Sequence, residues 1–223
     1  MSRTQYAIFD VGVSLVERIG TYVDLALTRR PWVSTLTLSV AFLASASIRA
    51  RARTLWFDEI LTEYIAAQPS FDAIWKVLAS HAESTPPLFH LLTKLSATAL
   101  GWSEFGMRFP AMAGYLLMML CLYFIVRRYA SPLYALIAVF SSYLTDAPGY
   151  ATSARPYGLL LGFSSLALLC WHVVSQHRFR KLALLGLCLS LAIALSVQYY
   201  AVLSFAAIGL GELVDCRREF VSG

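Results

Sequence analysis

The stretch that decides the fold covers residues 56–110. It begins Trp56-Phe-Asp-Glu59, passes through Glu83-Ser-Thr-Pro-Pro-Leu-Phe-His90 and ends Glu104-Phe-Gly-Met-Arg-Phe-Pro110. It combines charged residues, histidines and residues that start helices, whereas the chain on both sides consists mainly of apolar runs of membrane length. We therefore expect the chemistry of this protein to take place in this segment, against the membrane surface.

The composition places the chain among integral membrane proteins. Of its 223 residues, 58% are hydrophobic and only 14% are charged, whereas soluble domains carry about 25% charged residues. The net charge of +5 is explained by arginines at the ends of apolar runs, because no basic cluster alternates with exposed aromatic residues. We expect no nucleic-acid partner.

The apolar runs predict an all-α membrane protein with about six transmembrane helices. The first four spans are predicted at residues 31–48, 109–126, 132–145 and 158–174. The last run, residues 182–214, would be about 50 Å long as one helix, against about 30 Å of hydrocarbon. It is therefore predicted to form two spans that turn near Gln198. Residues 1–30 read as an amphipathic segment on the cytoplasmic side, and residues 31–223 as the transmembrane module.

The arginines of the short connections predict the orientation. Those at positions 29–30, 127–128, 178–181 and 217–218 fall on one side when six spans are threaded alternately, and the positive-inside bias makes that side cytoplasmic. The long loop 51–107, the loop 146–156 and the turn at Gln198 then share the outer side.

The long loop 51–107 carries the start and stop signals of three helices. Asp58 is predicted to cap the first helix and Ser70 the second, while Pro86-Pro87 starts a third that ends at Gly101. Each predicted helix has one apolar face. We expect these faces to lie on the bilayer surface or on the spans.

Five motifs in order resemble those of one enzyme family. They read Leu55-Trp-Phe-Asp-Glu, Glu83-Ser-Thr-Pro-Pro-Leu-Phe-His-Leu-Leu, Ser103-Glu-Phe-Gly-Met-Arg-Phe-Pro, Tyr150-Ala-Thr-Ser-Ala-Arg-Pro-Tyr and Gln198-Tyr-Tyr-Ala. Together they resemble the GT-C membrane glycosyltransferases, in particular the bacterial branch related to protein O-mannosyltransferases and aminoarabinose transferases. The resemblance covers residues 55–201, and five ordered motifs are far more specific than any one alone.

The resemblance implies a hexosyl- or pentosyltransferase that moves a sugar from a polyprenyl-phosphate-linked donor to an acceptor outside the cytoplasm. The implied acceptor is a lipid, a glycan or a protein. It also implies a multi-pass protein of the bacterial inner membrane, in contact with membrane lipids, with its active site on the extracytoplasmic side. Some members of the family bind a divalent metal ion at the acidic motif, which here is Asp58-Glu59.

Asp58 is the candidate catalytic base. An acceptor hydroxyl is a poor nucleophile, and a positioned carboxylate that accepts its proton contributes about 10²- to 10⁴-fold in rate. Glu59 is then an orienting group or a metal ligand. The alternative interpretation is structural, with Asp58 as a helix cap and Glu59 as a favourable charge in the first turn.

Four further residues are candidates for contact with the acceptor or with a metal ion: Glu83, His90, Tyr157 and Gln198. A possible divalent metal site combines Asp58 with Glu83, although no standard metal-ligand spacing is present. His90 is equally well explained as a polar residue at the water boundary.

The candidate ligands of the donor phosphate are Arg155, Arg108 and Arg53, because a guanidinium group matches phosphate geometry with two parallel hydrogen bonds. Structural alternatives exist for the first two. Arg155 is also explained as an arginine that extends to the membrane interface or pairs with Asp146, and Arg108 as the partner of Glu104 one helical turn away.

Two features favour an alternative function. Related sequences often carry glutamate in the stretch where this chain has Ser153, and family members are usually longer. The chain is therefore expected to be an amino-terminal module, apparently truncated: either the product of a truncated or split gene, or a fragment that needs a second chain to supply further spans. The alternative is a non-catalytic truncated relative or subunit of a membrane glycosyltransferase.

Overall fold

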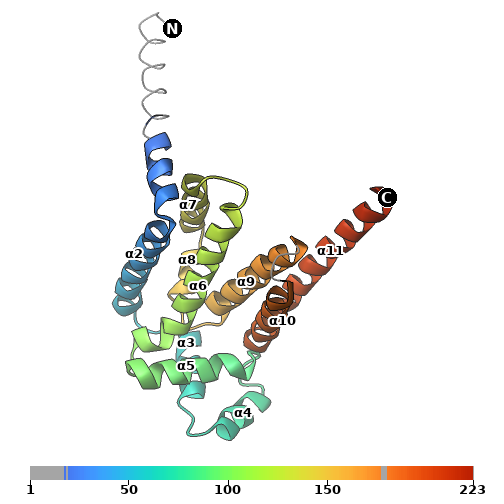
Figure 1. Ribbon diagram of the computed structural model, residues 1–223. Coiled ribbons are helices and arrows are strands. Elements are labelled where there is room, and N and C mark those ends of the chain that lie inside the picture. Colours follow the sequence, from blue (N-terminus) through green and yellow to red (C-terminus); the bar gives the residue numbers. More distant parts are fainter. Residues whose placement is uncertain (1–17, 19, 177–179, 223) are drawn as a thin grey trace, which may run out of the picture.

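The computed structural model describes residue 18, residues 20–176 and residues 180–222, and the described chain consists of helices joined by short connections, with no strand (Figure 1). Most of the predicted amphipathic segment 1–30 lies outside the described residues. The long helices are α2 (Pro31–Ala52), α6 (Glu104–Val126), α9 (Tyr157–Ser175), α10 (Arg180–Val197) and α11 (Val202–Ser222), and α7 (Pro132–Ser141) is shorter. The predicted all-α fold is confirmed.

Four of the six predicted spans are helices long and apolar enough to cross a membrane. They are Trp32–Ala52, Glu104–Val126, Tyr157–Ser175 and Arg180–Val197. The other two correspond to shorter apolar helices, Pro132–Leu144 and Tyr199–Val214. The chain is a membrane protein, and the total of six spans stays a prediction.

Three helices of the segment 51–107 lie together at one end of the bundle: α3 (Phe57–Ala66), α4 (Phe71–Ala79) and α5 (Pro87–Leu100) (Figure 1). Ser70 caps α4 by accepting the backbone N–H of Ala73 at 3.2 Å. The chain leaves α5 through Gly101 at φ 96°, a value that favours glycine. These local predictions are confirmed.

The predicted cap of the first helix is wrong. The helix begins two residues earlier than predicted, at Phe57 with Trp56 as the capping residue, so Asp58 occupies its second position. Glu59 accepts the backbone N–H of Trp56 at 2.9 Å, which is half of a capping box. The carboxylate that starts this helix is therefore Glu59, and Asp58 is left without a capping role.

Helix α6 is the centre of the bundle. The Tyr115 ring of α6 stacks on Phe42 of α2, with ring centroids 5.4 Å apart. Near its start, the Gly106 carbonyl accepts the hydroxyl of Ser96 in α5 at 2.7 Å. This bond between the loop helices and a membrane helix holds α5 across the end of the bundle.

Glycines bring α6 and α9 into backbone contact. A Cβ atom at Gly162 would overlap the carbonyl of Gly114, and one at Gly158 would overlap that of Ala111. Gly158 and Gly162 have the small-xxx-small spacing that allows membrane helices to approach closely. This contact fixes where α9 begins and thus fixes the residues immediately before it, including Arg155.

The predicted turn at Gln198 is confirmed, because α10 ends at Val197 and a short 3₁₀ helix, Tyr199–Ala201, precedes α11. Val197 packs in a cluster with Phe89 of α5 and Leu159 of α9. The three predicted outer loops therefore meet at one end of the bundle, as alternate threading requires.

The glycine contact predicts a position-specific loss of stability. We expect Gly162→Ala to lower the stability by about 1–3 kcal/mol, because the new methyl group forces two packed backbones apart. Thermal unfolding in detergent measures the change. Gly209→Ala is the matched control, since a Cβ there meets no atom within 4 Å. Equal unfolding temperatures for the two variants would contradict the close contact.

Candidate functional site

A buried ion pair joins the start of α3 to α6. Arg108 has no exposed surface and donates to both carboxylate oxygens of Glu59, from Nε to Oε1 at 2.9 Å and from Nη2 to Oε2 at 2.6 Å. Its remaining donors bond the carbonyls of Ala50, Arg53 and Thr54 at 2.7, 2.7 and 3.0 Å. A guanidinium group has five N–H donors, so Arg108 is fully used.

Glu59 also binds two backbone N–H groups. Besides the bond from Trp56, its Oε1 accepts the N–H of Ala154 at 2.6 Å. Burial raises the pKa of this carboxyl, but the hydrogen bonds from Arg108, Trp56 and Ala154 and the Arg108 charge outweigh burial, and the net pKa is lowered. Glu59 is an ionised carboxylate that ties α3, α6 and the segment before α9 together.

In this geometry, Arg108 and Glu59 hold the structure together and do not have groups free to bind a ligand. Arg108 pairs with Glu59 and not with Glu104, and no donor of its guanidinium is left for a phosphate. Glu59 accepts four hydrogen bonds, so its oxygens are not free for a proton or a metal ion. Of the roles considered for Glu59, orientation is the one that this arrangement supports.

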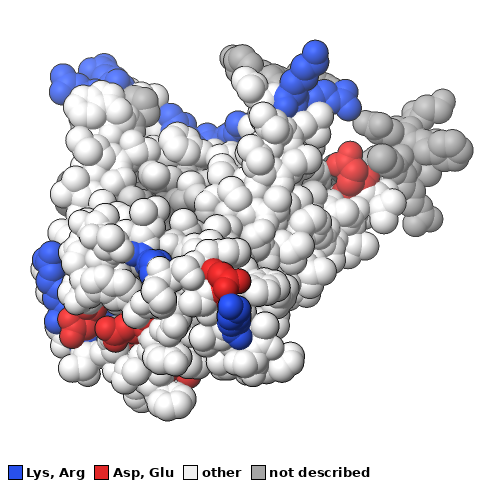
Figure 2. Space-filling view, turned by 90° about the horizontal axis from the view of Figure 1, so that it is seen from below, with Lys and Arg blue, Asp and Glu red and all other residues white. Residues whose placement is uncertain are grey.

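Asp58 and Arg155 face a shared open pocket of about 220 Å³. The pocket is lined by Arg53, Trp56, Asp58, Glu59, Tyr150, Ser153, Arg155 and Tyr157. The Asp58 side chain is 57% exposed, and its Oδ2 lies 3.8 Å from Arg155 Nη1. Figure 2 shows acidic and basic side chains in small mixed groups on this end of the molecule, separated by uncharged surface.

Arg155 contacts acidic partners far away in the sequence. Its Nη1 donates to Glu83 Oε1 at 3.1 Å and lies near Asp58, so the predicted alternative partner, Asp146, is wrong. Within the described part of the chain, the Nε and Nη2 groups of Arg155 make no hydrogen bond. The guanidinium is therefore anchored at one nitrogen and has a second edge available for an anion.

Behind Arg155 lie Glu83 and His90. Glu83 Oε1 also accepts the Thr85 hydroxyl at 2.9 Å, while its Oε2 lies 3.5 Å from Nε2 of His90, which is fully buried. Burial and the nearby Arg155 charge lower the pKa of His90 to about 4. The imidazole is therefore neutral at neutral pH, and its contact with Glu83 is not an ion pair.

The other candidates divide between the pocket and its surroundings. Tyr157 and Arg53 line the pocket, and the Tyr157 ring centroid lies 5.9 Å from Arg155 Cζ. Gln198 does not line it, and its Oε1 accepts the N–H of Tyr199 at 2.9 Å. His90 has no exposed surface, so in this arrangement it cannot touch an acceptor.

The predicted metal pair does not fit a divalent cation in this arrangement. Asp58 and Glu83 both lie against Nη1 of Arg155, so a positive charge already stands between the two carboxylates. Within the described residues, no group of three or more His, Cys, Asp and Glu side chains could hold a metal ion.

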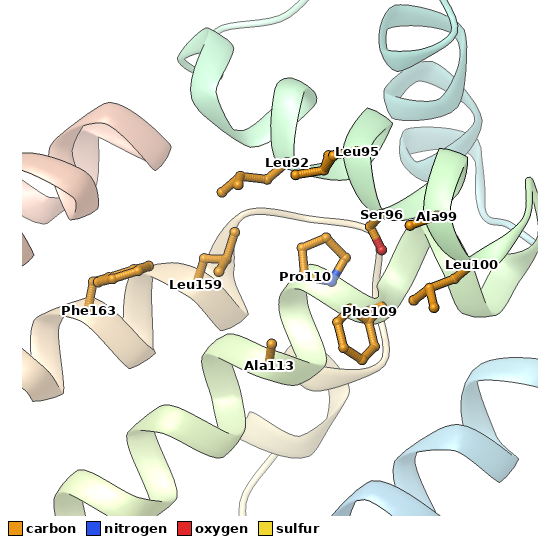
Figure 3. A pocket seen from close by; sticks show the side chains of 10 residues that line it. All are labelled: Leu92, Leu95, Ser96, Ala99, Leu100, Phe109, Pro110, Ala113, Leu159 and Phe163. Carbon is orange, nitrogen blue, oxygen red and sulfur yellow. The ribbon is translucent and has the colours of Figure 1, made fainter.

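An apolar recess of about 410 Å³ lies between α5, α6 and α9. Figure 3 shows its ten lining side chains, of which only Ser96 is polar, and this hydroxyl is occupied by the Gly106 carbonyl. Leu159 of the recess is two residues from Tyr157 of the open pocket. The first turn of α9 therefore borders both spaces.

Two aromatic residues of the pocket were not among the site residues predicted from the sequence. Trp56 and Tyr150 line it, and the Tyr150 and Tyr157 ring centroids are 5.2 Å apart. Both belong to motifs quoted for the family resemblance, which was the available signal. The Ala154 backbone N–H carried no such signal, since its partner is 95 residues away.

A comparison of the sequence with known protein families identifies the family of the chain. The sequence matches the family described as dolichyl-phosphate-mannose-protein mannosyltransferase over residues 84–219, more than half of the chain. The chain belongs to this family. It is therefore a membrane glycosyltransferase by family, as the motif resemblance predicted. No curated protein and no solved structure matches the chain.

The ion pair predicts a contrast between adjacent carboxylates. We expect Glu59→Gln to destabilise this glycosyltransferase by about 3–5 kcal/mol, because it leaves the Arg108 charge buried without a partner. Asp58→Asn is the control and should change the stability by no more than about 0.5 kcal/mol, since Asp58 is exposed. Thermal unfolding in detergent measures both. A smaller loss for Glu59→Gln than for Asp58→Asn would contradict the structural role of the pair.

Proposed function

We propose that this protein transfers a sugar from a polyprenyl-phosphate-linked donor to a hydroxyl acceptor, with Asp58 as the base and Arg155 as the ligand of the leaving phosphate. The observation that carries the proposal is the placement of both side chains in one open pocket, 3.8 Å apart. A proton acceptor and a phosphate-binding group are the two functions that this transfer requires.

In the proposed reaction, the acceptor oxygen forms a bond to the anomeric carbon of the sugar. The bond from that carbon to the phosphate oxygen breaks, and its electron pair leaves with the polyprenyl phosphate. The hydroxyl proton passes to an Asp58 carboxylate oxygen. The phosphate gains one negative charge, which the Arg155 guanidinium stabilises through its free edge.

The surroundings of the pocket support a lipid-linked sugar as the donor. Arg53 supplies a second positive charge, and the Trp56, Tyr150 and Tyr157 rings provide apolar faces for a sugar ring. The nearby recess of about 410 Å³ has the apolar lining that an isoprenoid chain requires. A water-soluble nucleotide sugar has no apolar chain that such a recess would bind.

We propose the extracytoplasmic side of a bacterial inner membrane as the location of this pocket. The support is the bias of arginines toward the other end of the spans. The acceptor then belongs to the cell envelope, as a lipid, a glycan or a protein.

Replacing Asp58 tests the chemistry. Asp58→Asn keeps the size of the side chain but removes the proton acceptor, so we expect transfer from a polyprenyl-phosphate sugar to fall by about 10²- to 10⁴-fold. The assay follows the appearance of glycosylated acceptor with purified protein in detergent or vesicles. Because Asp58 has no capping role, the unfolding temperature should hardly change.

Two outcomes and one control bear on this assignment. Full activity of Asp58→Asn would show that Asp58 is not the base. Gly209→Ala is a control that should transfer at the wild-type rate, because the added methyl group meets no atom within 4 Å. No transfer by the wild-type chain, tested with candidate donors and partner chains, would favour the non-catalytic alternative.

The orientation has its own test. A reporter fused after Thr85 should behave as extracytoplasmic and one fused after Arg180 as cytoplasmic, because an odd number of predicted spans separates the two positions. Alkaline phosphatase and green fluorescent protein fusions distinguish the two sides. If both positions report the same side, the predicted topology is wrong.

A further inference from the structure

The contact between Glu83 and His90 is not explained by the proposed reaction. Glu83 Oε2 and both ring nitrogens of His90 are buried, and within the described part of the chain none of the three has a hydrogen-bond partner. A buried polar group without a partner costs about 1–3 kcal/mol. Unpaired atoms that face each other at 3.5 Å therefore require a functional or structural reason.

The facing atoms belong to a series of side-chain contacts that ends in the open pocket. His90 Nε2 faces Glu83 Oε2, and Glu83 Oε1 accepts Arg155 Nη1 at 3.1 Å. Arg155 in turn reaches the pocket that contains Asp58. The glutamate thus has one oxygen on the buried histidine and the other on the arginine of the pocket.

We propose that His90 is a positioning residue that sets the orientation of Arg155 through Glu83 and thereby the affinity of the pocket for the phosphate of the donor lipid. The inference rests on the proposed function of Arg155. His90 itself touches neither donor nor acceptor, since it is fully buried on α5.

The physical basis is the geometry of a carboxylate with two different partners. A neutral imidazole that carries its proton on Nε2 donates to Glu83 Oε2 and holds the carboxylate plane, so that Oε1 presents its lone pairs to Arg155 in one direction. Catalytic hydrogen bonds are often long without substrate and shorten in the complex. When a phosphate draws the free edge of Arg155, the 3.5 Å contact closes to a hydrogen bond.

The rigidity of the surroundings gives this contact its directional effect. His90 lies edge-on to Phe89, with ring centroids 5.4 Å apart, and Phe89 is itself buried against Leu159 and Val197. The Thr85 hydroxyl holds Glu83 from a second side at 2.9 Å. The histidine therefore acts as a fixed donor to Glu83. Of the three side chains in this series of contacts, the arginine is the one that reaches solvent.

The test measures binding of a short-chain polyprenyl phosphate, without sugar, to the full chain in detergent. His90→Gln carries an N–H donor at the position of Nε2, whereas His90→Asn places its donor at the position of Nδ1. We expect His90→Gln to bind within about twofold of wild type and His90→Asn to bind about tenfold more weakly, the effect of one hydrogen bond to a charged group. Thermal unfolding confirms that both variants are folded.

The Arg155→Ala background separates positioning from a general structural role. There, His90→Asn should cause no further loss of affinity, because the group it positions is absent. The same loss in both backgrounds, or equal binding by His90→Gln and His90→Asn, would overturn the inference. If Arg155→Ala weakens binding and the His90 variants bind like wild type, only the role of His90 fails. If Arg155→Ala binds like wild type, the proposed function fails with it.

Discussion

The pocket depends on one buried ion pair. Arg108 is placed at the point where α2 ends, and its guanidinium donates to the carbonyls of Ala50, Arg53 and Thr54 there. The same group binds both oxygens of Glu59, which starts α3. The guanidinium of Arg108 thus binds the end of α2 and the start of α3, the helix that carries Asp58.

The pair also explains why two adjacent carboxylates have different roles. Burying two charges costs several kcal/mol per ion, and this desolvation penalty is offset only when the pair has excellent geometry and further hydrogen bonds. Glu59 meets that condition with four hydrogen bonds, including the N–H of Ala154 beside Arg155. Asp58, one residue earlier, is turned to solvent by the helix. The fully bonded carboxylate provides geometry, and the exposed one keeps its oxygens for a ligand.

The sequence predicted features with local causes and missed those set by packing. The Ser70 cap, the end of α5 at Gly101 and the turn at Gln198 follow from neighbouring residues. The motifs that resemble the family also contain most of the residues that line the open pocket. The nearest acidic residue was the wrong partner for both arginines, because Arg108 pairs over 49 residues and Arg155 over 72. Such pairs depend on which helix faces meet, which periodicity alone does not determine.

Arg155 stands between two carboxylates, and this position links the two halves of the proposed reaction. Before transfer, its charge is shared between Glu83 at 3.1 Å and Asp58 at 3.8 Å. The leaving phosphate gains a negative charge and competes for the same guanidinium. In the proposed reaction, the phosphate draws the Arg155 charge away from the two carboxylates and toward the free edge of the guanidinium. Glu83 binds Nη1 and holds the arginine in place, so the free edge of the guanidinium keeps one direction toward the proposed position of the phosphate while Asp58 faces the same pocket.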